Sequence, residues 1–98
     1  MSGPYQVIFT ARARVDLLAV RRWLHQPGSG LKARLRSARI TRAIVELQFT
    51  PFRWPEGDVA GVRERPIEGH RILYRIDEVH NSISVLRVFG PFQDRSDS

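Results

Sequence analysis

The spacing of apolar residues changes once along this chain, and that change most constrains the fold. From Ala11 to about Phe49 apolar residues recur every three or four positions, which predicts amphipathic helices. From Val62 to Phe89 they alternate with polar residues or run together, which is typical of β-strands. The short apolar run 5–9 lies ahead of the helical part and suits one more strand. This order of elements predicts an α+β domain.

Two helices are expected in the first half of the chain. Thr10 is placed as the N-cap of a helix over residues 11–26, because its hydroxyl can accept an unpaired backbone N–H. Residues 27–30, Pro-Gly-Ser-Gly, end this helix, and Pro51 ends a second one over residues 31–49. So short a break predicts an antiparallel helical hairpin. The expected buried positions are Ala13, Leu17, Val20 and Leu24 in the first helix, and Ala33, Ser37, Ile40, Ile44 and Leu47 in the second.

Three strands are expected in the second half, over residues 62–67, 70–77 and 83–89, and the breaks between them have hairpin lengths. The N-terminal strand must join them, because its backbone would otherwise be unpaired. We therefore expect an N-terminal strand, an antiparallel α-helical hairpin and a three-strand antiparallel meander that form one sheet, with residues 1–98 as a single domain. In the middle strand, one face carries His70, Ile72, Tyr74 and Ile76, and the other carries Arg71, Leu73 and Arg75.

Charge and composition narrow the function classes. The chain has 16 Lys and Arg against 10 Asp and Glu, a formal net charge of +6, which favours an acidic or polyanionic partner. It has no cysteine, so disulfide frameworks and Cys-ligated metals are excluded. With only three histidines, no metal or cofactor is expected. The apolar runs are shorter than the ~18–20 residues of a membrane span, and no signal-peptide core is evident. We expect a cytoplasmic protein with no membrane partner.

A series of local patterns resembles the RelE/ParE superfamily of toxins from bacterial type II toxin–antitoxin modules. The patterns are Phe9-Thr10-Ala11 leading to Asp16-Leu17-Leu18, Ile44–Leu47 before Thr50-Pro51, Val62-Arg63-Glu64 followed by Gly69–Ile76, and Ile83–Phe89 ending in Gln93-Asp94-Arg95. Their order and spacing cover about residues 5–95. The resemblance implies a sheet with the helical hairpin on one face and growth inhibition. It also implies a cognate antitoxin that neutralises the toxin in a hetero-oligomer.

The superfamily contains two activities, and the resemblance leaves both open. RelE-like members cut mRNA on the ribosome, whereas ParE-like members poison DNA gyrase. RNA cleavage without a metal needs a base, cations for the phosphate and an acid. Arg71 resembles a phosphate-binding position of the nuclease members. The expected nuclease set is Arg71, Arg87, His70 and Glu68, and the expected phosphate- or target-binding set is Arg63, Arg71, Arg75 and Arg87.

The residues after the last strand favour the gyrase poison. The nuclease relatives tend to place a Tyr, or a His-Tyr pair, just beyond this strand, whereas Phe92 has a ring without a hydroxyl. His70 and Tyr74 also have packing as an alternative role, because they share a face with Ile72. For Arg71 and Arg75 the alternative role is a local ion pair, for example with Glu64. The remaining alternatives are a RelE-like ribosome-dependent mRNA endoribonuclease and a basic nucleic-acid-binding module without toxicity.

The antitoxin is expected to lie along the helical hairpin and the basic sheet face. Apolar contacts should supply most of the affinity, while charge acts mainly on the association rate. The residues predicted to contact it are Leu17, Val20, Leu24, Arg36 and Arg39.

Overall fold

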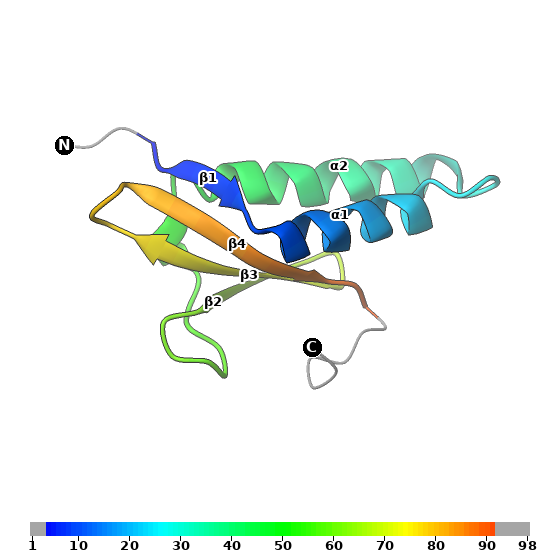
Figure 1. The fold of residues 1–98 in the computed structure, drawn as a ribbon. Coiled ribbons are helices and arrows are strands. Elements are labelled where there is room, and N and C mark those ends of the chain that lie inside the picture. Colours follow the sequence, from blue (N-terminus) through cyan, green and yellow to red (C-terminus); the bar gives the residue numbers. More distant parts are fainter. Residues whose placement is uncertain (1–3, 92–98) are drawn as a thin grey trace.

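The computed structural model describes residues 4–91, and its elements follow the predicted order (Figure 1). They are β1 (Gln6–Phe9), α1 (Ala11–Leu24), α2 (Gly30–Glu46), a 3-10 turn η1 (Pro51–Arg53), β2 (Arg63–Ile67), β3 (His70–Asp77) and β4 (Ser82–Phe89). Both helices end earlier than predicted. After α2 the chain continues in tighter turns, in which Gln48 and Phe49 donate to carbonyls three residues before them.

The strands form one four-stranded sheet in the order β1-β4-β3-β2. β2, β3 and β4 pair antiparallel, and β1 adds in parallel beside β4. The predicted single sheet is therefore confirmed. The β2–β3 hairpin turns on Glu68 and Gly69, which have φ of 51° and 77°, as a two-residue type I′ turn requires. The helices lie side by side on one face of the sheet, and no helix of the described residues covers the other (Figure 1).

The core lies between the helical hairpin and the sheet. The predicted helix stripes supply much of it, because residues at helical spacing face the strands together. In β3 the predicted inward positions His70, Ile72 and Tyr74 are buried, and Arg71 and Arg75 are exposed. The buried apolar cluster contains Ala13, Val20, Leu24, Ile40, Ala43, Ile44, Leu47, Ile72, Tyr74, Ile83, Val85 and Val88.

A β-bulge interrupts the pairing of β3 with β4. Leu73 pairs with Arg87 and Tyr74 pairs with Val85, so Leu86 is an extra residue on β4. Because of it, Val85 and Val88 both point into the core although three positions separate them. Arg87 is thereby placed opposite Leu73, outside the core.

Candidate functional site

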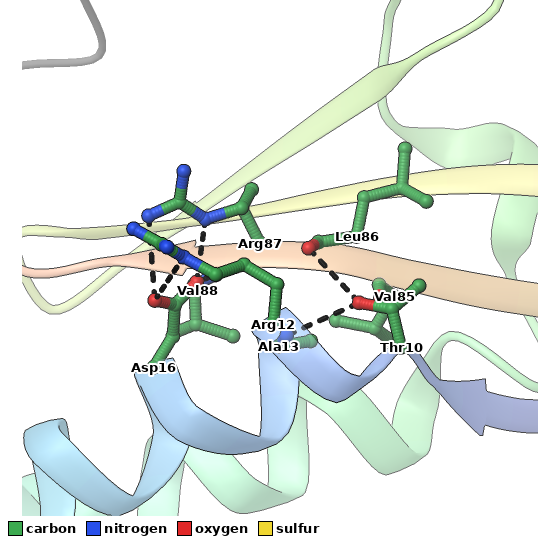
Figure 2. A network of polar contacts seen from close by, with 8 residues as sticks. All are labelled: Thr10, Arg12, Ala13, Asp16, Val85, Leu86, Arg87 and Val88. Carbon is green, nitrogen blue, oxygen red and sulfur yellow. Dashed lines mark hydrogen bonds and ion pairs between the residues drawn. The ribbon is translucent and has the colours of Figure 1, made fainter. Parts of the chain in front are cut away.

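The open edge of β4 is closed by side chains from the start of α1. The pairing of β1 with β4 ends where Phe9 meets Val85, and Thr10 then begins the helix. The Thr10 hydroxyl lies 3.1 Å from the Val85 and Leu86 carbonyl oxygens and accepts the Ala13 N–H, so the predicted N-cap is confirmed. Thr10 thus joins the helix start to the strand edge (Figure 2).

Asp16 completes this connection six residues further along the chain, in α1. Its carboxylate accepts the Val88 backbone N–H at 3.0 Å and the Arg87 Nε–H at 2.7 Å (Figure 2). The side chains of Asp16 and Arg87 are only 5% and 14% exposed. Arg12, four residues before Asp16 in the same helix, lies further away, at 3.6 Å, and is 62% exposed. We call Thr10, Asp16, Arg87 and the Val88 N–H the latch.

The latch changes the role of Arg87. The sequence placed Arg87 among the cations that bind phosphate or the target. In the structure its guanidinium is paired with a buried carboxylate and lies over the Phe89 ring, 4.4 Å from the centroid. An arginine held in this way is already neutralised, so it is a poor ligand for a second anion.

Arg63, another member of the predicted set, has backbone and aromatic partners. It pairs with Tyr74 in register, so it lies on the face of the sheet that carries the core. Its guanidinium donates to the Trp54 carbonyl and lies over the Phe52 ring, 5.3 Å from the centroid. Arg63 therefore braces the segment that contains η1, and it lines a pocket together with Arg75.

Arg71 and Arg75 remain together on the uncovered face of β3, which we call the outer face. Arg71 is half-exposed and lies 3.5 Å from the Glu64 carboxylate, one of the local acids considered from sequence. Arg75 is exposed, opposite Ser84, and residues 4–91 give it no hydrogen bond or ion pair. Across from Arg71 lie Pro66 and Phe89, neither of which can transfer a proton.

The expected acid–base groups are turned away from this face. His70 is 1% exposed, its Nδ1 lies 2.8 Å from the Glu68 carbonyl, and its buried Nε2 has no hydrogen-bond partner within the described chain. The Glu68 carboxylate pairs with Arg39 at 3.0 Å. The placement of His70 fits its alternative role in packing, and as a base it would have no access to a bound phosphodiester.

Tyr74 is a second buried polar ring of β3. It is fully enclosed, and its hydroxyl donates to the Pro51 carbonyl. Burial raises the pKa of Tyr74 to about 12, although the nearby Arg63 and Arg65 lower it in part. Tyr74 therefore stays protonated near neutral pH and fastens β3 to η1.

The antitoxin-contacting residues predicted from sequence require a correction. Val20 and Leu24 are 6% and 2% exposed and belong to the core, so they are not available to a partner. Leu17 is partly buried against the same core. The error came from assigning one apolar stripe of α1 to two partners, since the stripe that packs on the sheet cannot also face outward. Arg36 and Arg39 are exposed on α2, as expected.

Sequence reasoning missed the apolar residues on the outward side of the hairpin. Val15 and Leu18 of α1 are 61% and 54% exposed, and Leu31, Leu35 and Val45 of α2 are 69%, 45% and 47% exposed. The spacing of the α2 residues in the sequence could have revealed them, because they recur at helical spacing on the side of α2 opposite its buried stripe.

Other kinds of site find little support within residues 4–91. No group of three or more His, Asp or Glu side chains there could hold a metal ion. No described helix is long and apolar enough to cross a membrane. The residues after the last strand on which the sequence analysis relied, Phe92 to Arg95, lie outside the described residues.

Comparisons with known proteins agree on one fold. A family model described as "ParE toxin of type II toxin-antitoxin system, parDE" matches residues 7–90. A chain of the chromosomal ParDE toxin–antitoxin system from P. aeruginosa has a TM-score of 0.73 at 22% identity, covering 91% of this chain and 98% of that one.

Two RelBE complexes are also similar. A chain of the toxin–antitoxin complex RelBE2 from Mycobacterium tuberculosis has a TM-score of 0.57 at 32% identity, covering 89% of this chain and 98% of that one. A chain of the intact E. coli RelBE complex has a TM-score of 0.64 at 14% identity, covering 93% and 99%. A search of curated protein sequences gave no significant match.

Proposed function

Because the chain belongs to the ParE toxin family of type II toxin–antitoxin systems, we propose that it arrests growth by poisoning DNA gyrase and that a cognate antitoxin neutralises it. The outer face is the proposed target-binding surface, with Arg71 and Arg75 as its cations. An exposed guanidinium can hold two oxygens of a carboxylate or phosphate, so this surface suits an acidic protein segment or a nucleic-acid backbone.

One observation carries the choice of gyrase over RNA. Beside Arg71 the outer face presents no available proton-transfer group among the described residues, and the exposed Asp77–His80 pair lies at the other end of β3. His70 and Tyr74 point into the core, and the carboxylate beside Arg71, that of Glu64, is ion-paired and 11% exposed. RNA cleavage needs proton transfer at the attacking and leaving oxygens, whereas binding to a target protein does not. The ParE family model and the ParDE neighbour support the same choice.

The mRNA nuclease is the second candidate, because the RelBE2 chain is 32% identical to this one. In that case Arg71 anchors the scissile phosphate. Removal of one such preorganised cation should slow cleavage by about 10²–10³-fold.

A paired assay on one preparation tests the proposal. We expect purified protein to inhibit gyrase supercoiling or trap cleaved DNA, while ribosome-bound mRNA stays intact. Codon-positioned mRNA cleavage that is lost in Arg71→Ala would overturn the proposal in favour of the nuclease. Unaffected growth during strong expression of folded protein, with steeply salt-dependent DNA or RNA binding, would instead indicate a basic nucleic-acid-binding module.

The antitoxin is proposed to cover the exposed apolar residues of the helical hairpin. Three similar structures are toxin–antitoxin systems or complexes, which supports an antitoxin partner. Co-expression of the gene beside the toxin gene should restore growth. Continued arrest when both proteins are present and folded would contradict neutralisation by that gene product.

A further inference from the structure

An open groove lies between α1 and α2. Its lining residues follow at intervals of three, four and seven positions, starting at Leu18 in α1 and at Arg34 in α2. Residues at these intervals share one face of a helix, so each helix presents one continuous wall. The space between the walls has a volume of about 680 Å³, within the range of roughly 300–1,000 Å³ that small-molecule sites occupy.

The charged side chains that line this groove, which we call the basic groove, are all arginines. Arg21 and Arg22 lie on the α1 wall and Arg34 lies on the α2 wall, while His25 adds an imidazole just after the end of α1. No carboxylate lines the groove, and residues 4–91 give none of the three arginines an ion pair. Like charges so close together repel one another. An anion in the groove would remove this repulsion.

A buried hydroxyl belongs to the same groove. Ser37 lines the α2 wall and is 7% exposed, and residues 4–91 give its hydroxyl no hydrogen-bond partner. Most buried polar groups in proteins are paired, so an unpaired hydroxyl beside cations indicates a missing acceptor. Arg21 Nη2 donates to Thr41 Oγ1 at 3.4 Å, which holds this guanidinium across the groove. The basic groove therefore combines unpaired cations with a buried donor that lacks an acceptor.

The number and spacing of these groups select the chemistry of the ligand. A guanidinium holds two phosphate oxygens at once, so three of them match several adjoining phosphates, whereas a single carboxylate would leave most of the positive charge unpaired. The lining extends over seven residues of each helix, about 10 Å at the helical rise. Proteins that bind duplex DNA through its backbone commonly contact roughly 6–10 phosphates over a longer surface. The basic groove is too short for that mode and fits a compact chain of phosphates.

We propose that the basic groove binds a compact polyphosphate, either free or as the phosphate chain of a nucleotide. Arg21 and Arg22 from α1 and Arg34 from α2 hold its phosphate oxygens, and the Ser37 hydroxyl donates to one of them. A cleft lined by charge of one sign raises the local concentration of the opposite ion, which favours capture of this ligand. The site goes beyond the proposed function, because it requires neither gyrase nor an antitoxin.

The first test measures binding of inorganic tripolyphosphate to the full chain by calorimetry. Leu18 lines the groove and is also among the exposed apolar residues proposed for the antitoxin, so the chain is used without antitoxin. Tripolyphosphate should bind at least about tenfold more tightly than orthophosphate, because it reaches several guanidinium groups at once. Equal affinity for the two anions would overturn the proposal, since the cations would then not act as one site.

Two substitutions on α2 separate a built site from the general positive charge. Arg34→Ala should weaken tripolyphosphate binding by about tenfold, as expected for the loss of one charge-assisted contact. Arg36→Ala is the matched control, because it removes the same charge from an exposed arginine outside the groove lining. Two residues turn a helix by about 200°, so Arg36 faces away from Arg34. Equal weakening in the two variants would show an effect of net charge alone and would overturn the site.

A third substitution tests the uncharged contact. Ser37→Ala removes the hydroxyl and keeps the net charge, and alanine suits the interior of a helix, so the chain should stay folded. Binding of tripolyphosphate should weaken about threefold or more, as for the loss of one hydrogen bond. Circular dichroism checks that each variant is folded. Wild-type affinity in folded Ser37→Ala would contradict the proposed geometry.

Two further probes identify the source of the phosphates. Tighter binding of ATP than of tripolyphosphate would indicate a nucleotide, and equal binding would indicate the phosphate chain alone. Both results support the site when the binding weakens in Arg34→Ala. A short DNA duplex that binds more tightly than tripolyphosphate, again through Arg34, would overturn the compact ligand in favour of a nucleic-acid surface.

Discussion

Arginine has opposite roles in the latch and on the outer face. At the latch, Arg87 is 14% exposed and bound to a carboxylate that is itself 5% exposed. On the outer face, Arg71 is 50% exposed, and Arg75 is exposed opposite a serine. The two regions are on neighbouring strands, and they differ in how closely the arginine is enclosed, because Arg87 lies 2.7 Å from Asp16 whereas Arg71 lies 3.5 Å from Glu64 and keeps half of its side chain exposed. An arginine enclosed with a carboxylate holds the fold together, whereas an exposed arginine is available to a target.

The largest expected effect is the removal of the latch carboxylate. Asp16→Ala leaves the Arg87 guanidinium and the Val88 N–H enclosed without their partner, so the free energy of unfolding should fall by about 3–5 kcal/mol. Urea denaturation followed by circular dichroism measures this loss. Arg12→Ala is the control, because it removes only the exposed contact and should cost less than about 1 kcal/mol. A similar small loss in both variants would mean that the latch does not stabilise the fold.

An intermediate effect on the free energy of unfolding is expected from Tyr74, a buried polar group of β3. Its pKa is about 12 in the folded chain and near 10 when unfolded, so the folded state keeps the proton at a pH where the unfolded state has lost it. Between pH 10 and 12 this group should therefore lower the free energy of unfolding by about 1.4 kcal/mol per pH unit. Stability curves at several alkaline pH values check the slope, which should be smaller in Tyr74→Phe. An equal slope in both proteins would show that Tyr74 is not responsible.

The smallest effect on stability is expected on the outer face. Arg71→Ala and Arg75→Ala should each change the free energy of unfolding by less than about 1 kcal/mol, because exposed ion pairs contribute little. The double variant should nevertheless need about tenfold more protein for the same gyrase inhibition, about 1.4 kcal/mol of binding. Supercoiling assays over a concentration series measure this shift. Unchanged inhibition would place the target-binding surface elsewhere, and a large stability loss would remove the contrast with the latch.

Much of the fold could be predicted because its signals are local. Thr10 caps α1 as its residue type and position indicated, and Glu68-Gly69 forms the two-residue hairpin turn. The alternation in β3 correctly separated His70 and Tyr74 from Arg71 and Arg75. These features depend on neighbours within a few residues, which are visible in the sequence.

The candidate site was harder to predict because a charged residue has many potential partners. Four arginines were assigned to one binding set, and in the structure two of them have other partners. Arg63 lies on the core side with Trp54, and Arg87 lies in the latch. Residue type and strand parity do not show which acid or carbonyl a flexible guanidinium meets.

By itself, the sequence determined the order of the elements, the two helix stripes that reach the core, the face of each β3 side chain and the excess of positive charge. Only the tertiary structure decided the partners across the chain. Asp16 and Arg87 are 71 positions apart, and they meet because β1 ends early and α1 begins at the open edge of β4. The bulge at Leu86 then turns Arg87 out of the core. Hydrophobic periodicity acts over a few residues, whereas the end of one strand and the bulge in another act through packing between distant segments.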